Sequence, residues 1–256
     1  MKHEKKKYID GIFNYCDRWC EKCRFTANCR LFSIESRIYT HQILNDGKLP
    51  NAEDIFKYEI KDTKKFEREF DEDNFWEDVD LDFDKEEKED DLFKRFEEKK
   101  EYQVEKLTDK YFHKTYSFLK SFDNKFNFAE SVNQKRKEPG FQILFDNIEI
   151  VSWYHMFIMV KIKRALEGKG DLKIGIDEFD NEISTYDMNG STKIAAIAVK
   201  RSQKALNNLF SLVEEFSSEI EEIMVLLGKI LNHLDQEFPG YKKFLRPGFD
   251  TEKSNL

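Results

Sequence analysis

The chain has 256 residues, of which 37% are charged and 39% are apolar, with only 10 glycines and 4 prolines. This composition is typical of long helices and argues against a turn-rich sheet protein. The formal net charge of -8 argues against non-specific binding of nucleic acid by the chain as a whole. We find no signal peptide and no run of about 20 uncharged apolar residues that would cross a membrane, so we expect a soluble, cytoplasmic protein.

The N-terminal stretch has the periodicity of a helix. Its apolar residues Tyr8, Ile12, Tyr15 and Trp19 recur every three or four positions. This spacing predicts a helix over residues 5–23.

All four cysteines of the chain fall within fourteen positions of this region. Cys16, Cys20, Cys23 and Cys29 follow the pattern C-x3-C-x2-C-x5-C. Cytosolic thiols stay reduced, so the clustering indicates a metal site, with a redox-active thiol pair at Cys20 and Cys23 as the alternative. Four thiolates suit either zinc or an iron–sulfur cluster of the [4Fe–4S] type, and spacing alone does not separate the two.

Helix geometry constrains this metal site. On an unbroken helix Cys16, Cys20 and Cys23 would share one face but spread over roughly 10.5 Å along the axis, at about 1.5 Å per residue. A single zinc ion needs its sulfur ligands about 2.3 Å from one point. Metal binding therefore requires either a break in the helix near Cys20 or a larger cofactor such as a cluster.

The segment from Cys20 to Cys29 resembles the iron–sulfur loop of DNA glycosylases of the endonuclease III and adenine glycosylase type. In those enzymes the last three ligands are spaced C-x2-C-x5-C, as they are here. The first gap differs, with three residues before Cys20 instead of six, and no helix–hairpin–helix motif accompanies the segment. The resemblance implies a ligand role for these cysteines and does not imply DNA repair.

Two helical segments and then a strongly acidic run follow the cysteines. A second helix is predicted over residues 31–44, and residues 52–70 are weakly helical. Residues 71–91 carry thirteen Asp or Glu against two Lys, a local net charge of -11. Such a run is typical of a solvated linker. The alternative is an amphipathic acidic segment that docks on a basic protein partner or folds back over the protein's own basic surface.

The C-terminal two-thirds predicts a helical bundle. A heptad-like stripe predicts a long helix over residues 90–122, and residues 142–166 are apolar nearly all round, as in a helix at the middle of a bundle. Residues 189–192, Asn-Gly-Ser-Thr, predict the cap of a further helix that runs to Leu212. A last helix is expected over residues 217–237, followed by an irregular tail.

One further group of ionisable residues lies in the apolar segment. Glu149, His155, Lys161 and Arg164 are candidates for a small-molecule pocket, and ionisable groups with perturbed pKa values do cluster at functional sites. The simpler interpretation is a core histidine beside ion pairs with the acidic residues 177–182. The chain has no phosphate-binding loop and no GxGxxG turn, so nucleotide binding has no support.

Four longer stretches carry a wider resemblance, to an uncharacterised family of bacterial helical proteins with an N-terminal four-cysteine motif. They are the segments 15–23, 153–166, 190–195 and 246–250. This resemblance implies a family and no activity.

Together these observations predict an all-α protein, a helical bundle with an N-terminal cysteine-rich metal-binding segment. We expect N-terminal helices with the metal site in residues 1–48, a linker in 49–91, the bundle in 92–237 and an irregular tail in 238–256. The predicted function is metal binding, with a structural or regulatory role. The alternatives are an iron–sulfur redox enzyme, a small-molecule enzyme with a pocket around His155, and an interaction protein that acts through residues 71–91.

Overall fold

The structure, a computed structural model, describes residues 8–50, 102–127, 139–174 and 178–250. These residues are helical or irregular, and no strand occurs among them, so the fold is all-α as predicted. They divide into two compact units, one with residues 8–13 and 18–50 and the other with residues 14–17 and everything described from residue 102 onward. The predictions for residues 52–70 and 71–91 lie outside the described part of the chain.

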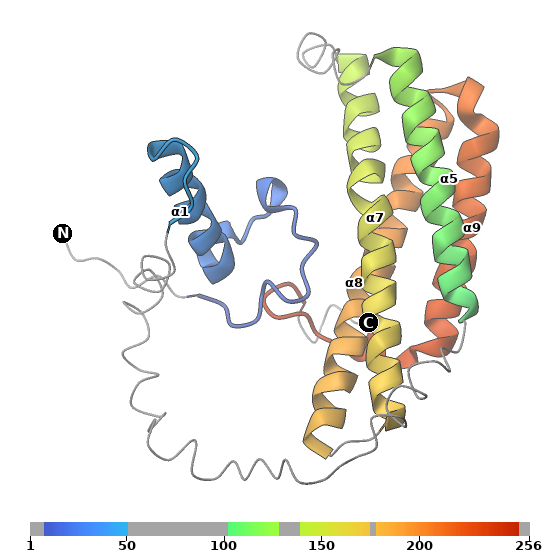
Figure 1. Ribbon diagram of the computed structural model, residues 1–256. Coiled ribbons are helices and arrows are strands. Elements are labelled where there is room, and N and C mark those ends of the chain that lie inside the picture. The colour runs from blue at the N-terminus through green and yellow to red at the C-terminus, as the bar shows by residue number, and fades with distance from the viewer. Residues whose placement is uncertain (1–7, 51–101, 128–138, 175–177, 251–256) are drawn as a thin grey trace, which may run out of the picture. The chain divides into compact units, whose positions relative to one another are not determined.

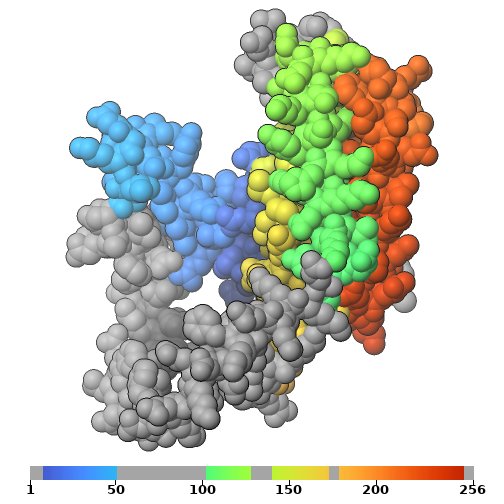
Figure 2. Space-filling view, turned by 45° about the vertical axis from the view of Figure 1, so that its right-hand side comes forward, coloured from blue at the N-terminus to red at the C-terminus, as the bar shows by residue number. Residues whose placement is uncertain are grey.

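The larger unit is built on four long helices (Figure 1). Helices α7 and α9 each pack against both α5 and α8, so the four surround one core, and Figure 2 shows α5 beside α9 on one face. Short connections join α7 to α8 and α8 to α9, as expected for antiparallel neighbours in a bundle. The helices are α5 (Gln103–Phe126), α7 (Pro139–Ile174), α8 (Glu178–Phe210) and α9 (Ser217–Glu237).

The core follows from heptad-like patterns in the sequence. The buried residues of α5 alternate at spacings of four and three, which places them on one side of the helix. They are Val104, Thr108, Tyr111, Thr115, Phe118 and Phe122. In α9 a stripe with nearly the same spacing is buried: Ile220, Ile223, Leu226, Leu227, Ile230 and Leu234. The predicted helix over 217–237 is therefore confirmed, and the helix predicted over 90–122 is confirmed from Gln103 onward and continues to Phe126.

Helices α7 and α8 form a longer hairpin than the sequence predicts. One helix was predicted over residues 142–166 and the next from the cap at residues 189–192, but α7 continues to Ile174 and α8 already begins at Glu178. Gly168 explains part of the difference, because a Cβ there would lie 3.2 Å from Met188 Cβ and 3.3 Å from the Ser184 carbonyl oxygen. This glycine lets the two helices approach closely rather than marking a turn.

The helix cap predicted at residues 189–192 is wrong for the same reason. These residues lie inside α8, and Ser191 and Thr192 are fully buried. The Thr192 hydroxyl donates to the Met188 carbonyl oxygen four residues earlier, a bond that occurs within helices. Packing against the neighbouring helices therefore overrides the local capping signal.

Helix α7 lies on one side of the bundle rather than at its middle. Ile158 and Ile162 are fully buried, whereas Met156 and Val160 are about half exposed. The segment Gly140–Leu172 is long and apolar enough to cross a membrane by length and composition, which the sequence analysis did not predict. The same helix packs against both α5 and α8.

The C-terminal tail packs on the bundle. Phe238 ends α9, and a short 3-10 helix, η4 (Pro239–Lys243), follows and contacts α8. Tyr241 and Phe244 are buried, so the tail predicted to be irregular still contributes apolar side chains to the core. Its last described residues are closed by a bidentate ion pair between Arg246 and Asp250.

The smaller unit contains one α-helix among its described residues, α1 (Arg30–Leu44), which confirms the helix predicted over 31–44. No residue of α1 is buried. The apolar side chains Tyr39, Ile43 and Leu44 are all more than 60% exposed. Helix α1 therefore gains little from packing in this unit.

Candidate metal centre

The cysteine segment is a chain of turns, and the helix predicted over residues 5–23 is wrong for its described part. Gly11 and Arg18 have positive φ angles of 68° and 58°, which a right-handed helix does not allow. Two single-turn 3-10 helices follow, η1 (Cys20–Lys22) and η2 (Thr26–Asn28). The chain therefore turns in this segment and does not continue as a straight helix.

Two of the sulfur atoms accept backbone hydrogen bonds. The Phe25 N–H donates to Cys23 Sγ at 3.4 Å, and the Phe32 N–H donates to Cys29 Sγ at 3.4 Å. The first bond spans two residues, and the second caps the N-terminus of α1. Sulfur is a weak acceptor as a neutral thiol, so N–H groups directed at sulfur suit a thiolate better.

The thiols have the right chemistry for zinc or an iron–sulfur cluster. All four are partly exposed, and none forms a disulfide bond. Within the described residues, no three His, Cys, Asp or Glu side chains are arranged to hold a metal ion. The suitability of the four cysteines for a metal therefore rests on three features: thiol donors, their spacing in the sequence, and the backbone N–H groups at two of the sulfur atoms.

Cys16 belongs to the larger unit and has a different environment. On its N-terminal side the Tyr15 ring packs edge-on against Tyr186 of α8 and Phe244 of the tail, with centroids 5.6 and 4.9 Å away. Gly190 of α8 makes room for this ring, since a Cβ at that position would lie 2.3 Å from it. The bundle surface is therefore shaped around Tyr15.

The Tyr15 hydroxyl is also held. It donates to Asp187 Oδ1 at 3.2 Å, and the same carboxylate receives two hydrogen bonds of 2.7 Å from Arg164. Burial and the neighbouring Asp187 raise the pKa of Tyr15 well above its ordinary value. The phenol therefore stays protonated at neutral pH and remains a donor.

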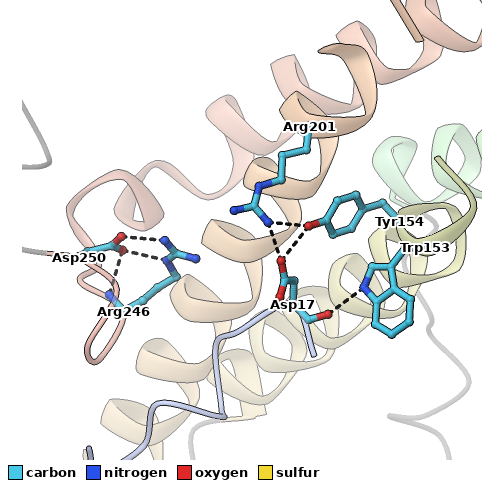
Figure 3. Close-up of polar contacts among 6 residues, drawn as sticks. All are labelled: Asp17, Trp153, Tyr154, Arg201, Arg246 and Asp250. Carbon is cyan, nitrogen blue, oxygen red and sulfur yellow. Dashed lines mark hydrogen bonds and ion pairs between the residues drawn. The ribbon is translucent and has the colours of Figure 1, made fainter. Parts of the chain in front are cut away.

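On the C-terminal side of Cys16, Asp17 is fixed to α7 and α8 (Figure 3). Its Oδ2 accepts from the Tyr154 hydroxyl at 2.8 Å and from Arg201 Nη1 at 2.5 Å, and its backbone oxygen accepts from Trp153 Nε1 at 3.0 Å. Arg201 Nη1 also donates to the Tyr154 oxygen at 2.5 Å. Burial is the main cause that raises the pKa of Tyr154 to about 12, so this hydroxyl too remains a donor.

The residues predicted to line a pocket face different helices. His155 stacks on Phe112 of α5 with centroids 5.4 Å apart, and its Nδ1 donates to the Ser152 carbonyl oxygen at 2.6 Å. Arg164 instead faces α8, where it pairs with Asp187.

The other two predicted pocket residues also lie on α7. Lys161 Nζ lies 5.6 Å from the centre of the Phe157 ring, on the same helix, and Glu149 is half-buried. The structure thus places the four residues on one helix but on different sides of it.

An open cleft of about 990 Å³ lies along the outer side of the α7–α8 hairpin. Of the four predicted pocket residues, Arg164 lines it, together with Tyr15, Asp187 and Ile183. The acidic residues Glu167, Asp171 and Glu182 also line it. The cleft is therefore mixed in charge and apolar only in part.

Sequence reasoning missed the bundle residues that contact Tyr15 and Asp17. Trp153, Tyr154 and Gly190 lie in stretches that carried the wider resemblance, so a signal for them existed. The sequence carried no such signal for Asp187 and Arg201. They contact Tyr15 and Asp17, which lie more than 170 positions away in the chain.

Comparison of the chain with protein-family models, with curated proteins and with solved structures finds no match.

Proposed function

We propose that this protein binds a metal through the thiolates of Cys16, Cys20, Cys23 and Cys29, as zinc or as a [4Fe–4S] cluster, in a structural or regulatory role in the cytoplasm. The observation that carries the proposal is the pair of backbone N–H groups directed at Cys23 Sγ and Cys29 Sγ. Hydrogen bonds of this kind orient ligating side chains and tune the electronic properties of the metal.

The small apolar content of the smaller unit favours a structural role. Helix α1 buries none of its residues, and η1 and η2 bury none of theirs. A short segment that cannot bury enough apolar surface is commonly folded by its metal, whose binding free energy then becomes folding free energy. Zinc would supply cross-linking alone, whereas a cluster would also supply one-electron transfer.

Elemental analysis and an absorbance spectrum of freshly purified protein test the proposal. Zinc predicts one metal ion per chain and no visible colour, and a cluster predicts about four irons per chain with a visible sulfur-to-iron charge-transfer band. The protein should be prepared both in air and anaerobically, because clusters are lost to oxygen. Neither zinc nor iron above background in both preparations would reject the proposal.

Cys29 allows ligation to be separated from helix capping. Its Sγ caps α1 in the structure, and serine is a strong N-cap residue, so Cys29→Ser keeps the cap while it removes the thiolate. We expect Cys29→Ser to lose metal as fully as Cys29→Ala. Ala27→Ser is the matched control, because it adds a hydroxyl group at an exposed position of the same segment and should keep the metal. Retention of metal by Cys29→Ser would assign the sulfur to capping alone.

A further inference from the structure

The α7–α8 cleft exposes apolar side chains from both of its helices. Val160 of α7 and Ile183 and Tyr186 of α8 line it, and each of the three is about half exposed. Single exposed apolar residues are normal on a protein surface, whereas apolar residues that share a cleft are typical of a binding site. Each described residue that lines the cleft belongs to the larger unit, so the geometry of the cleft is set within that unit.

The two cations among the described lining residues are each paired with an aspartate. Arg164 donates two hydrogen bonds of 2.7 Å to the Asp187 carboxylate. Lys163 Nζ lies 3.7 Å from Asp109 Oδ1 of α5. The positive charge of the cleft is therefore largely neutralised by the protein itself.

Three carboxylates of the cleft form no ion pair with any residue that the structure describes. They are Glu167 and Asp171 of α7 and Glu182 of α8, and all three are exposed. Glu167 acts on Arg164 electrostatically without pairing with it. Because Glu167 and Asp171 are four residues apart, they share one side of α7, and Glu182 comes from the other helix. Negative charge thus flanks the apolar side chains on both helices.

We propose that the α7–α8 cleft is a docking surface for a basic amphipathic helix of a partner protein. Val160 and Asp171 are eleven residues apart in α7, which is roughly 16 Å or three turns along the helix axis. A helix of about three turns would place its apolar face on Val160, Ile183 and Tyr186. Its flanking lysines or arginines would then meet the three unpaired carboxylates. This role goes beyond metal binding and does not depend on it.

The charge and the openness of the cleft argue against other occupants. Sites for small molecules enclose most of the ligand surface, whereas this cleft is open. A second copy of the chain that docked through the same cleft would bring three further carboxylates to the interface, and like charges across an interface are unfavourable. The phosphates of a nucleic acid would be repelled in the same way.

Fluorescence anisotropy of the full-length protein with a labelled peptide tests the proposal. The probe is a peptide of leucine and lysine of about 15 residues, roughly four helical turns, with the leucines on one helical face. A scrambled peptide of the same composition has the same charge but no apolar face. We expect the amphipathic peptide to bind about 10-fold more tightly than the scrambled one, because only it buries the apolar side chains of the cleft.

Charge variants then locate the binding site. The cleft variant combines Glu167→Gln, Asp171→Asn and Glu182→Gln, and its affinity for the peptide should be about 10-fold lower at low salt and closer to that of the wild type at high salt. The matched control makes the same change in net charge at exposed positions of η3 and α9, and its affinity should stay near that of the wild type. It combines Glu214→Gln, Glu219→Gln and Glu221→Gln.

An apolar variant tests the other half of the surface. Val160→Ser with Ile183→Ser should lower peptide affinity at every salt concentration, and thermal unfolding should show that the protein stays folded, because both positions are half exposed. Equal losses in the cleft variant and its matched control would assign binding to net charge and overturn the proposal. Equal binding of the two peptides to the wild type, or no binding of either, would overturn it too.

Discussion

The four-helix bundle and the cysteine segment are built by different means. In the bundle, heptad-like stripes bury whole side chains such as Phe118, Ile158 and Leu227. In the segment from residue 18 to residue 50, the only α-helix buries nothing, and turns with hydrogen-bonded sulfur atoms replace an apolar stripe. The comparison shows that the bundle has a buried apolar core, whereas the described helix of the segment has none. The proposed metal would supply the stability that this segment does not gain from burial.

The largest expected effect comes from the core of the bundle. Leu227→Ala removes a fully buried side chain from α9 and should lower the free energy of unfolding by about 2–5 kcal/mol, from lost burial and the cavity left behind. Val225→Ala, at a position 51% exposed on the same helix, should change it by less than about 0.5 kcal/mol. Denaturant unfolding measures both.

The same pair of variants also tests the difference between the two regions. Both should keep the wild-type ratio of metal to protein when they are folded. Loss of metal from folded Leu227→Ala protein would contradict the separation between core stability and metal binding.

A pair of glycine substitutions gives the next largest effect. Gly190→Ala would place a Cβ 2.3 Å from the Tyr15 ring and should destabilise the protein by about 1–3 kcal/mol through overpacking. Gly228→Ala in α9 meets nothing within 4 Å and should stabilise by about 0.5–1 kcal/mol, because alanine is the better helix former. Thermal unfolding shows whether each variant is more or less stable than the wild type. Equal effects would show that Tyr15 is not packed against Gly190.

The Arg246–Asp250 ion pair predicts a pH dependence. Burial alone would raise the pKa of the Asp250 carboxyl, but hydrogen bonds from the Arg246 side chain and backbone outweigh it and hold the pKa below its ordinary value. The pair therefore contributes its full stability above the ordinary aspartate value of about 3.9 and loses it as the pH falls through the lowered pKa.

Asp250→Asn tests the sign of this dependence. It should cost about 1–3 kcal/mol at neutral pH and flatten the acid side of the stability curve. The measurement is the denaturant midpoint of the wild type and of Asp250→Asn, from neutral to strongly acidic pH. An unchanged acid slope in the variant would show that Asp250 does not titrate as described.

The smallest effect should come from the surface of the bundle. Lys114 of α5 pairs with Glu222 of α9, and both side chains are about half exposed. Such pairs contribute about 0–1 kcal/mol and are screened by salt. Lys114→Ala should therefore shift the denaturant midpoint little at low salt and less at high salt. A large loss of stability that does not depend on salt would contradict this description of Lys114 and Glu222 as an exposed, screened ion pair.

The sequence predicted the parts of the fold that depend on periodicity. Helix α9 has the predicted bounds, and α5 and α1 differ from prediction by a few residues where the structure describes them. It failed where tertiary contacts override local signals. Residues 189–192 predicted a helix cap but lie inside α8, and Arg18 adopts a left-handed conformation inside an apparent helical stripe.

The candidate site was predictable only in its chemistry. The cysteine spacing predicts four thiolate donors, and it gives no sign that Tyr15 packs on Gly190 or that Asp17 contacts Tyr154 and Arg201. Such partners come from positions far apart in the chain, and no periodicity or spacing connects them. The bend of the cysteine segment was one of two alternatives that helix geometry left open, and the structure has it.

Amide hydrogen exchange, with and without a chelator, tests the central claim most directly. The claim predicts that the Phe25 and Phe32 amides, which donate to Cys23 and Cys29, exchange slowly in the metal-loaded protein and much faster after the metal is removed. Amides near Leu227 in the bundle core should stay protected in both states. Equal exchange at Phe25 and Phe32 with and without metal would contradict the account.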